Sequence, residues 1–277
     1  MTSFAAPETL PDALSLLAAG GTAVAGGTDL VVAARSGRRA LPDVLVSLHR
    51  LRELRGIGTG ADGALRIGAL ATHAELERSE NVRSGCAALA DAAALVGSPA
   101  TRHVGTVGGN LANASPAMEL GAPLLVHDAR VETSGGRAVS LESFLSGPGE
   151  TALEPGELIT AVTVRRPGAS AYVRLEYRRA MEIAVVGAAA LVALGSDGRV
   201  EDARVALTAV APTCVRAAAA EESLRGARVE AFAAAAQLAV EAAEPISDVR
   251  ASERYRRAQV PVVVRRALEQ AYERARQ

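Results

Sequence analysis

Lysine is absent from this sequence of 277 residues, because all 30 of its basic side chains are arginines. Mechanisms that need a lysine are therefore excluded, among them pyridoxal Schiff bases, P-loop phosphate binding and kinase chemistry. The arginines are balanced by 31 acidic side chains, which leaves a formal net charge of -1. Without a global positive field, we expect neither nucleic acid nor an anionic membrane surface as a partner.

Cysteine and long apolar runs are also scarce. Cys86 and Cys214 lie far apart, so they predict neither a disulfide framework nor a cysteine-ligated zinc or iron–sulfur site. The histidines lack ligand spacing, and we expect no metal site. No apolar run approaches the roughly 20 residues that span a bilayer, and residues 1–8 lack a basic start and an apolar core. We expect a cytoplasmic protein without membrane insertion.

The composition that remains is typical of a globular protein, with 49% hydrophobic and 22% charged residues. At roughly 150 residues per domain, the chain has room for two domains. A turn at residues 165–168 marks the expected boundary. It separates a domain of residues 1–168, with parts of about 1–55 and 56–168, from a domain of residues 169–277. Strands precede helices in the second domain, which favours the α+β class.

Periodicity and turn residues predict short strands and helices throughout. A helix is expected over residues 10–17 with Thr9 as its N-cap, and Thr72 with Glu75 has the spacing of a capping box. Residues 102–113 are so rich in glycine and asparagine that we predict no regular structure there. We expect strands over residues 22–25, 43–48, 64–70, 157–164, 171–177, 183–194 and 203–210, and further helices over 30–35, 82–96, 216–243 and 252–277.

A G-x-G-x-x-G dinucleotide fingerprint occurs at residues 58–63. A Rossmann turn follows a strand and opens a helix, whereas this segment follows an arginine-rich stretch and precedes a short alternating strand. The pattern therefore indicates a hairpin or surface turn. No G-x-S-x-G nucleophile elbow occurs either.

Two other glycine clusters fit a phosphate-binding role better. Ala25–Leu30 lies at a strand-to-helix turn, where backbone amides and a helix N-terminus capped by Thr28 or Asp29 could bind an anion without lysine. Thr106–Asn110 offers amides and hydroxyls in one short loop. Each segment also has a plainer interpretation, a capped tight turn for the first and an ordinary loop for the second. Together they favour a pyrophosphate held from both sides, in a dinucleotide site outside the Rossmann scheme.

At these residues the sequence resembles a known family. The segments VAGGTDL and TRHVGTVGGNLANASPAMEL resemble the two FAD-binding signatures of the medium, flavoprotein subunit of molybdenum hydroxylases, the xanthine dehydrogenase and carbon monoxide dehydrogenase family. The segments AYVRLEYRRAMEIAVVGAAA, ALTAVAP and SERYRRAQVPVVVRRALEQA resemble the C-terminal domain of the same subunit. The resemblance covers nearly the whole chain.

The resemblance implies an α+β fold with a two-part FAD-binding domain of the p-cresol methylhydroxylase type. A smaller α+β domain, with a three-stranded antiparallel sheet and helices, would follow and close over the flavin. FAD would be the cofactor of this chain, and no side chain need act as an acid or base. The implied FAD-binding residues are Ala23, Val24, Ala25, Gly26, Gly27, Thr28, Asp29, Leu30, Val96, Thr106, Val107, Gly108, Gly109, Asn110, Glu119, Ile159 and Arg174.

Several of these positions have an implied role. The backbone amides of the two glycine segments would hold the pyrophosphate, and Val96 and Ile159 would make apolar contacts. Glu119 stands where the family usually has Asp, which implies a hydrogen bond to the ribose or adenine side of FAD. Arg174 stands where many members have a flavin-site Lys, so it keeps the positive charge with a different geometry. Ile183 matches a position near the isoalloxazine ring.

The resemblance also implies partners. Family members work with a large molybdopterin subunit that hydroxylates the substrate and a small subunit that carries two [2Fe–2S] clusters, together as a dimer of heterotrimers. This chain would pass electrons from those clusters through FAD to NAD⁺ or another acceptor. The alternatives are a self-sufficient FAD-dependent oxidoreductase that acts on a small substrate, and a scaffold subunit that has lost its flavin. Few aromatic residues argue against the first, and intact glycine motifs argue against the second.

Overall fold

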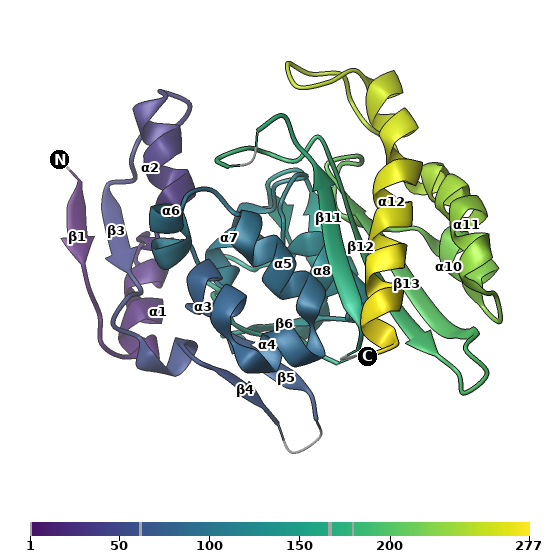
Figure 1. The fold of residues 1–277 in the computed structure, drawn as a ribbon. Coiled ribbons are helices and arrows are strands. Elements are labelled where there is room, and N and C mark those ends of the chain that lie inside the picture. Colours follow the sequence, from purple (N-terminus) through teal and green to yellow (C-terminus); the bar gives the residue numbers. More distant parts are fainter. Residues whose placement is uncertain (1, 61–62, 166–167, 179) are drawn as a thin grey trace.

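The computed structural model describes residues 2–60, 63–165, 168–178 and 180–277 (Figure 1). Residues 61–62 of the G-x-G-x-x-G segment and residues 166–167 of the expected domain boundary lie outside this described part. The chain folds into an α+β arrangement with three principal sheets, which follow one another along the sequence.

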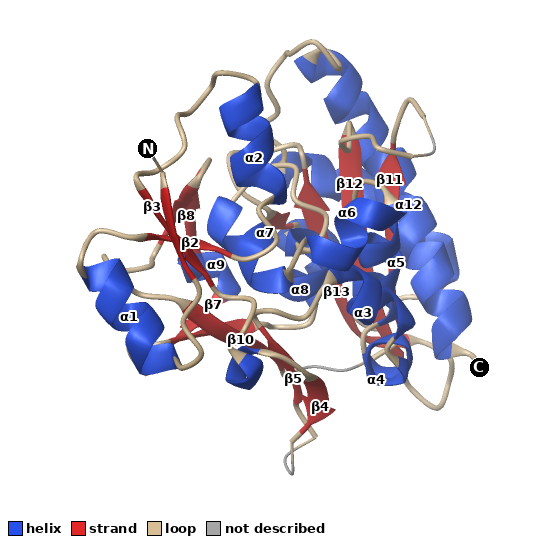
Figure 2. Ribbon diagram, turned by 90° about the vertical axis from the view of Figure 1, so that its left-hand side faces the viewer, coloured by secondary structure: helices blue, strands red, loops and turns tan. Residues whose placement is uncertain are grey.

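The first sheet is parallel, in the order β1(Ser3–Ala5), β3(Val44–Ser47), β2(Thr22–Val24). Helix α1(Leu10–Ala18) links β1 to β2, and α2(Thr28–Arg35) lies between β2 and β3; Figure 2 shows the two helices on opposite sides of the strands. The Thr9 hydroxyl accepts from the Asp12 amide, so the predicted N-cap of α1 is confirmed. A short 3₁₀ turn, η1(Arg52–Leu54), ends this part.

The second sheet is antiparallel, in the order β4(Ile57–Thr59), β5(Leu65–Gly68), β10(Ile159–Val164), β6(Arg130–Thr133), β7(Ala138–Ser140). Strands β4 and β5 pair as the hairpin expected for the glycine-rich segment between them. The other elements of this part are α3(His73–Arg78), α4(Glu80–Gly85), α5(Ala87–Leu95), α6(Pro99–Val104), α7(Val107–Asn113), α8(Gly121–Val126) and α9(Leu141–Phe144), with the small hairpin β8(Leu145–Gly147) and β9(Glu150–Thr151).

The third sheet is antiparallel, in the order β11(Ser170–Leu175), β12(Val186–Leu194), β13(Val200–Thr208), β14(Val215–Arg216). The predicted three strands are present, and the two-residue β14 adds a fourth, which corrects the expected number. Figure 1 shows α12(Glu253–Ala275) along β11 and β12. The remaining elements are α10(Ala218–Leu224), η2(Val229–Ala231), α11(Phe232–Leu238) and η3(Ala239–Ala242).

The third sheet is buried on both faces because its side chains alternate between two cores. Tyr172, Ala189 and Leu191 join the core of the second sheet and its helices. Ala190 and Val205 belong to the core beneath α10, α11 and α12. The C-terminal region is therefore packed against the preceding region of the chain, and the two are not joined by a linker alone.

The prediction of irregular structure over residues 102–113 is wrong. This stretch contains the end of α6 and the whole of α7, and the hydroxyls of Ser98 and Thr106 cap the two helices. The amides of Val107 and Gly108 donate to the carbonyls of Ala71 and Ala69 beyond the end of β5. Docking onto this backbone thus overrides the weak helix propensity of glycine and asparagine.

Other boundaries shift by smaller amounts. The predicted helix over 82–96 is divided at Cys86 into α4 and α5, and the one over 216–243 is divided into α10, α11 and two 3₁₀ turns. The Thr72–Glu75 capping box is confirmed, with both reciprocal hydrogen bonds present. None of the helices in the described part of the chain is long and apolar enough to cross a membrane.

Candidate functional site

The first glycine segment turns the chain sharply from β2 into α2. A Cβ atom on Gly26 would lie 1.9 Å from the Val104 carbonyl oxygen, so only glycine fits there. Gly27 has a φ of +68° and is the N-cap of α2, with no side-chain capping bond. This corrects the expectation that Thr28 or Asp29 caps the helix, because glycine adopts the left-handed conformation without a steric penalty.

The N-terminus of α2 leaves backbone donors open. Within the described chain, no carbonyl or side chain accepts from the N–H groups of Gly26, Gly27 or Thr28. The first turn of a helix always has such orphan donors, and the helix dipole adds partial positive charge there. The segment is therefore suited to bind a phosphate group by its backbone alone.

The second glycine segment uses its amides differently. Besides the Val107 and Gly108 bonds to the β5 end, the Gly109 amide donates to the Thr106 hydroxyl at 3.1 Å and the Asn110 amide to the Thr106 carbonyl at 2.9 Å. The sequence assigns the amides of Thr106–Asn110 to the pyrophosphate. Those of residues 107–110 donate to protein acceptors, and the assignment of the segment to the cofactor remains a prediction. The Asn110 side-chain oxygen, by contrast, is buried without a partner among the described residues. A buried acceptor of this kind needs a donor from a ligand or water.

The two adjacent glycines of α7 have different surroundings. A Cβ atom on Gly108 would lie 2.8 Å from the Ala69 side chain and 2.9 Å from its carbonyl oxygen. A Cβ atom on Gly109 would meet the Thr106 hydroxyl at 3.1 Å and nothing else within 4 Å. Gly108 is thus required by the packing of α7 on the protein, whereas the space beside Gly109 is open to a ligand.

The structure brings the two glycine segments together. Gly26 packs on the Val104–Gly105 backbone, directly before the second segment, and the Asn113 side-chain amide donates to the Asp29 carboxylate at 3.2 Å. Burial raises the pKa of Asp29, and the hydrogen bond from Thr28 opposes that shift. The two glycine segments are therefore neighbours in space.

His73 packs against the junction of the two glycine segments. The sequence did not identify it as part of the site. Its amide donates to the Gly105 carbonyl at 3.1 Å, and its imidazole packs against Gly105. The side chain is buried, and burial, with a smaller contribution from Arg102, lowers its pKa to about 4. The imidazole is therefore neutral near pH 7. The only available signal was its position directly after the capping residue Thr72.

Glu119 and Arg174 are partners of each other. The Arg174 guanidinium donates to Glu119 at 2.5 Å and to Glu176 at 2.6 Å, and the Tyr172 hydroxyl donates to the other Glu119 oxygen at 2.5 Å. The side chain of Arg174 is only 2% exposed and that of Glu119 8%. Burial raises the pKa of Glu119 even though Arg174 opposes the shift. The expected positive charge of Arg174 is thus offset by carboxylates, which the sequence did not indicate.

The other predicted contact residues lie in varied surroundings. Val96 is the C-cap of α5 and is half-buried, and its carbonyl accepts from Arg102 at 3.3 Å. Ile159 is the first residue of β10 and is buried in the core. Ile183 lies on the loop between β11 and β12 and is 43% exposed. Of the three, Ile183 is the one with a substantial free surface.

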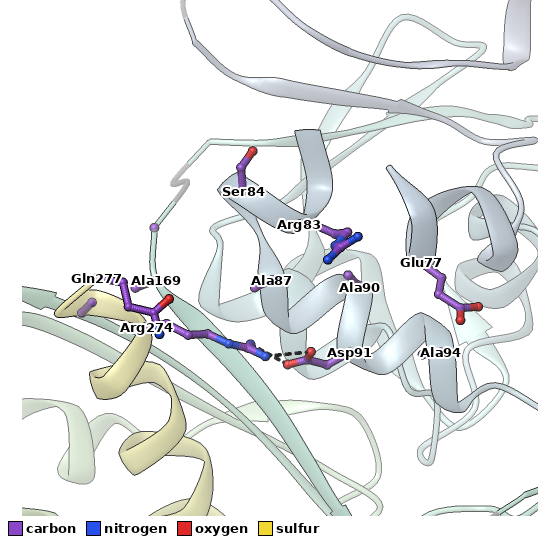
Figure 3. A pocket seen from close by; sticks show the side chains of 12 residues that line it. Glu77, Arg83, Ser84, Ala87, Ala90, Asp91, Ala94, Ala169, Arg274 and Gln277 are labelled. Carbon is purple, nitrogen blue, oxygen red and sulfur yellow. Dashed lines mark hydrogen bonds and ion pairs between the residues drawn. The ribbon is translucent and has the colours of Figure 1, made fainter. Parts of the chain in front are cut away.

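A separate cavity of about 700 Å³ opens between α5 and the C-terminal end of α12. Figure 3 shows the ion pair between Arg274 and Asp91 beside it, at 2.7 Å. None of the predicted FAD-binding residues lines this cavity, so it is distinct from the glycine-segment site. In the described part of the chain, no group of His, Cys, Asp and Glu side chains is arranged to hold a metal ion.

The fold, with its two adjacent glycine segments, is that expected of a dinucleotide-binding protein outside the Rossmann scheme. Residues 1–167 match the family model of the FAD binding domain in molybdopterin dehydrogenase. Residues 171–271 match that of the CO dehydrogenase flavoprotein C-terminal domain. The chain therefore belongs to the FAD-binding subunits of the molybdenum hydroxylases and is an oxidoreductase subunit. The resemblance inferred from the glycine motifs is confirmed.

Individual relatives match over nearly their full length. The putative xanthine dehydrogenase FAD-binding subunit XdhB of Escherichia coli K12 is 31% identical, covering 97% of this chain and 95% of that protein. The carbon monoxide dehydrogenase medium chain of Afipia carboxidovorans is 32% identical, covering 98% and 96%. A crystal structure of the cyanide-inactivated Cu,Mo-CO dehydrogenase matches with a TM-score of 0.93 at 31% identity, covering 99% and 98%. These matches confirm the predicted fold class.

Proposed function

We propose that this chain carries FAD as the electron-transfer subunit of a molybdenum hydroxylase. The residues named below would hold FAD, and bound FAD would supply the redox chemistry for electron transfer from the [2Fe–2S] clusters of a small subunit to NAD⁺ or another acceptor. The assembly proposed is a dimer of heterotrimers with a large molybdopterin subunit. Support comes from the relatives, which are called medium chains or FAD-binding subunits in their own complexes.

The observation that carries this proposal is the open first turn of α2, on a segment that packs against the backbone directly before the second glycine segment. We assign the pyrophosphate of FAD to the amides of Gly26, Gly27 and Thr28, because no acceptor among the described residues takes them. The Asn110 oxygen would accept from a hydroxyl or N–H group of the cofactor. The rest of segments 23–30 and 106–110, with Val96 and Ile159, would shape and support the site.

Glu119 and Arg174 enter the proposal as a pair. Glu119 follows α7 in the FAD-binding region, and Arg174 lies on β11 of the C-terminal region, so their bond joins the two regions. Tyr172 holds the Glu119 carboxylate from the other side. We assign to these residues the task of positioning the C-terminal region against the FAD site. The positive charge that Arg174 would contribute near the flavin is therefore paired with the carboxylate of Glu119.

The test is coexpression of the chain with its partner subunits, followed by absorbance spectroscopy and chromatography of the cofactor released on denaturation. The expected result is one FAD per chain, with iron and molybdenum in the same purified complex. Anaerobic addition of substrate should bleach the flavin only when the iron–sulfur subunit is present. A colourless complex would contradict FAD binding. A flavin that is reduced by a small substrate in the chain alone would instead identify a self-sufficient oxidoreductase.

A further inference from the structure

Helix α2 lacks the packing that normally stabilises so short a helix. It has eight residues, and none of them is buried. Isolated helices below about 12 residues are marginal in water, and most helical stability in proteins comes from a buried face. Val31 is 44% exposed, Val32 55%, and Leu41 in the following segment 44%. The described chain thus leaves an apolar surface on α2 uncovered, and Figures 1 and 2 both show the helix at the periphery.

The same surface carries positive charge without compensation. Arg35 ends α2, and Arg38 and Arg39 follow it, all of them exposed. Across the described residues, no carboxylate lies within ion-pair distance of these arginines, and Arg38 donates only to the Ser36 hydroxyl at 2.9 Å. Arg50 and Arg66, elsewhere on the surface, have acidic partners at 3.0 Å. The charge at α2 is therefore available to a second molecule.

We propose that the α2 surface, formed by Val31, Val32, Leu41, Arg35, Arg38 and Arg39, docks the subunit that donates electrons to FAD. The partner expected is a protein face with an apolar centre and a rim of carboxylates, because exposed valines flanked by unpaired arginines have that complement. This inference rests on the proposed function. Helix α2 begins at the open amides assigned to FAD and spans only about 12 Å, so a subunit seated on it would lie beside the cofactor.

The experiment compares two double charge reversals in binding to the partner subunits. R38E/R39E reverses charge on the α2 surface, and R254E/R266E makes the same change in net charge at exposed positions of α12 that have no ion pair among the described residues. Both variants, R38K/R39K and the wild-type chain are titrated against the purified partner subcomplex at low and moderate salt, with FAD present. R38E/R39E should weaken binding by about tenfold or more at low salt and flatten its salt dependence.

The controls separate docking from FAD binding. R38K/R39K should bind within about threefold of wild type, because the charge is kept. Val32→Ser should also weaken binding, and the factor by which it does so should be the same at low and at moderate salt. This substitution removes apolar contact without altering charge. Equal weakening by R38E/R39E and R254E/R266E would overturn the inference, as would no weakening by either. Loss of FAD from R38E/R39E in the saturated complex would also overturn it, because the surface would then belong to the cofactor site.

Discussion

The two glycine segments look alike in sequence but serve the site in different ways. The segment at Gly26 and Gly27 leaves its amides free at the start of α2, whereas the segment at Gly108 and Gly109 gives its amides to Ala69, Ala71 and Thr106. The first is a binding surface made of backbone, and the second is a platform docked on the sheet. Consecutive glycines therefore indicate close backbone approach, but not whether the neighbour is a ligand or the protein itself.

The largest effect is expected from disrupting the contact between the two glycine segments. In Gly26→Ala, the new methyl group would meet the Val104 carbonyl at 1.9 Å, so the two segments must separate. FAD retention in the assembled complex should fall by at least about tenfold, and overpacking of this kind typically costs about 1–3 kcal/mol of stability. Gly58→Ala is the matched control, because a Cβ atom there meets nothing within 4 Å. Full flavin content in Gly26→Ala would show that the segments do not form one site.

Acidification should lower the free energy of unfolding through His73, which packs against Gly105 directly before the second glycine segment. Its pKa is lowered from 6.5 to about 4 in the folded chain, so between these values the unfolded chain binds a proton that the folded chain does not. Stability therefore falls as pH falls through this window, by about 3 kcal/mol in all from this group. Urea unfolding at several pH values measures the slope. His73→Asn should flatten it and the exposed His103→Asn should not; an unchanged slope in His73→Asn would contradict the assignment.

The two glycines of α7 should separate stability from binding. Gly108→Ala places a methyl group against Ala69 and should lower the free energy of unfolding by about 1–3 kcal/mol. Gly109→Ala has space within the protein, so it should leave stability nearly unchanged but weaken FAD binding. Thermal unfolding of the chain and FAD titration of the complex measure the two effects. If both variants lose stability alike, the space beside Gly109 is not a cofactor site.

The smallest effect is expected at Asp29. Burial raises its pKa above the unfolded value of 3.8, so the protonated form favours folding and this contribution is lost as pH rises through the folded pKa. Asp29→Asn should therefore stabilise the chain slightly at neutral pH while keeping an acceptor for Asn113. It should also tighten FAD binding by about twofold, because a carboxylate near the pyrophosphate is removed. Weaker FAD binding would show that the carboxylate contacts the cofactor favourably.

Local signals predicted much of the fold. The caps at Thr9 and Thr72, the strands of the third sheet and the long C-terminal helix follow from periodicity and hydrogen-bonding side chains that act within a few residues. Helix α7 could not be predicted this way, because its stability comes from carbonyls of Ala69 and Ala71, far from it in sequence. For the site, the sequence indicated both glycine segments. It did not indicate that the amides of the first are open whereas those of the second donate to the protein.

The bond between Glu119 and Arg174 has a consequence for hybrid proteins made from members of this family. The resemblance in sequence implies Asp at the position of Glu119 and Lys at that of Arg174 in many members, and in this chain the two side chains meet across the two regions. A hybrid that joins residues 1–168 of this chain to the C-terminal region of a relative with Lys would leave the buried Glu119 facing a shorter, single-point cation. Such hybrids should be stable only when both residues of the pair come from the same parent protein. The pair therefore limits which N-terminal and C-terminal regions can be combined.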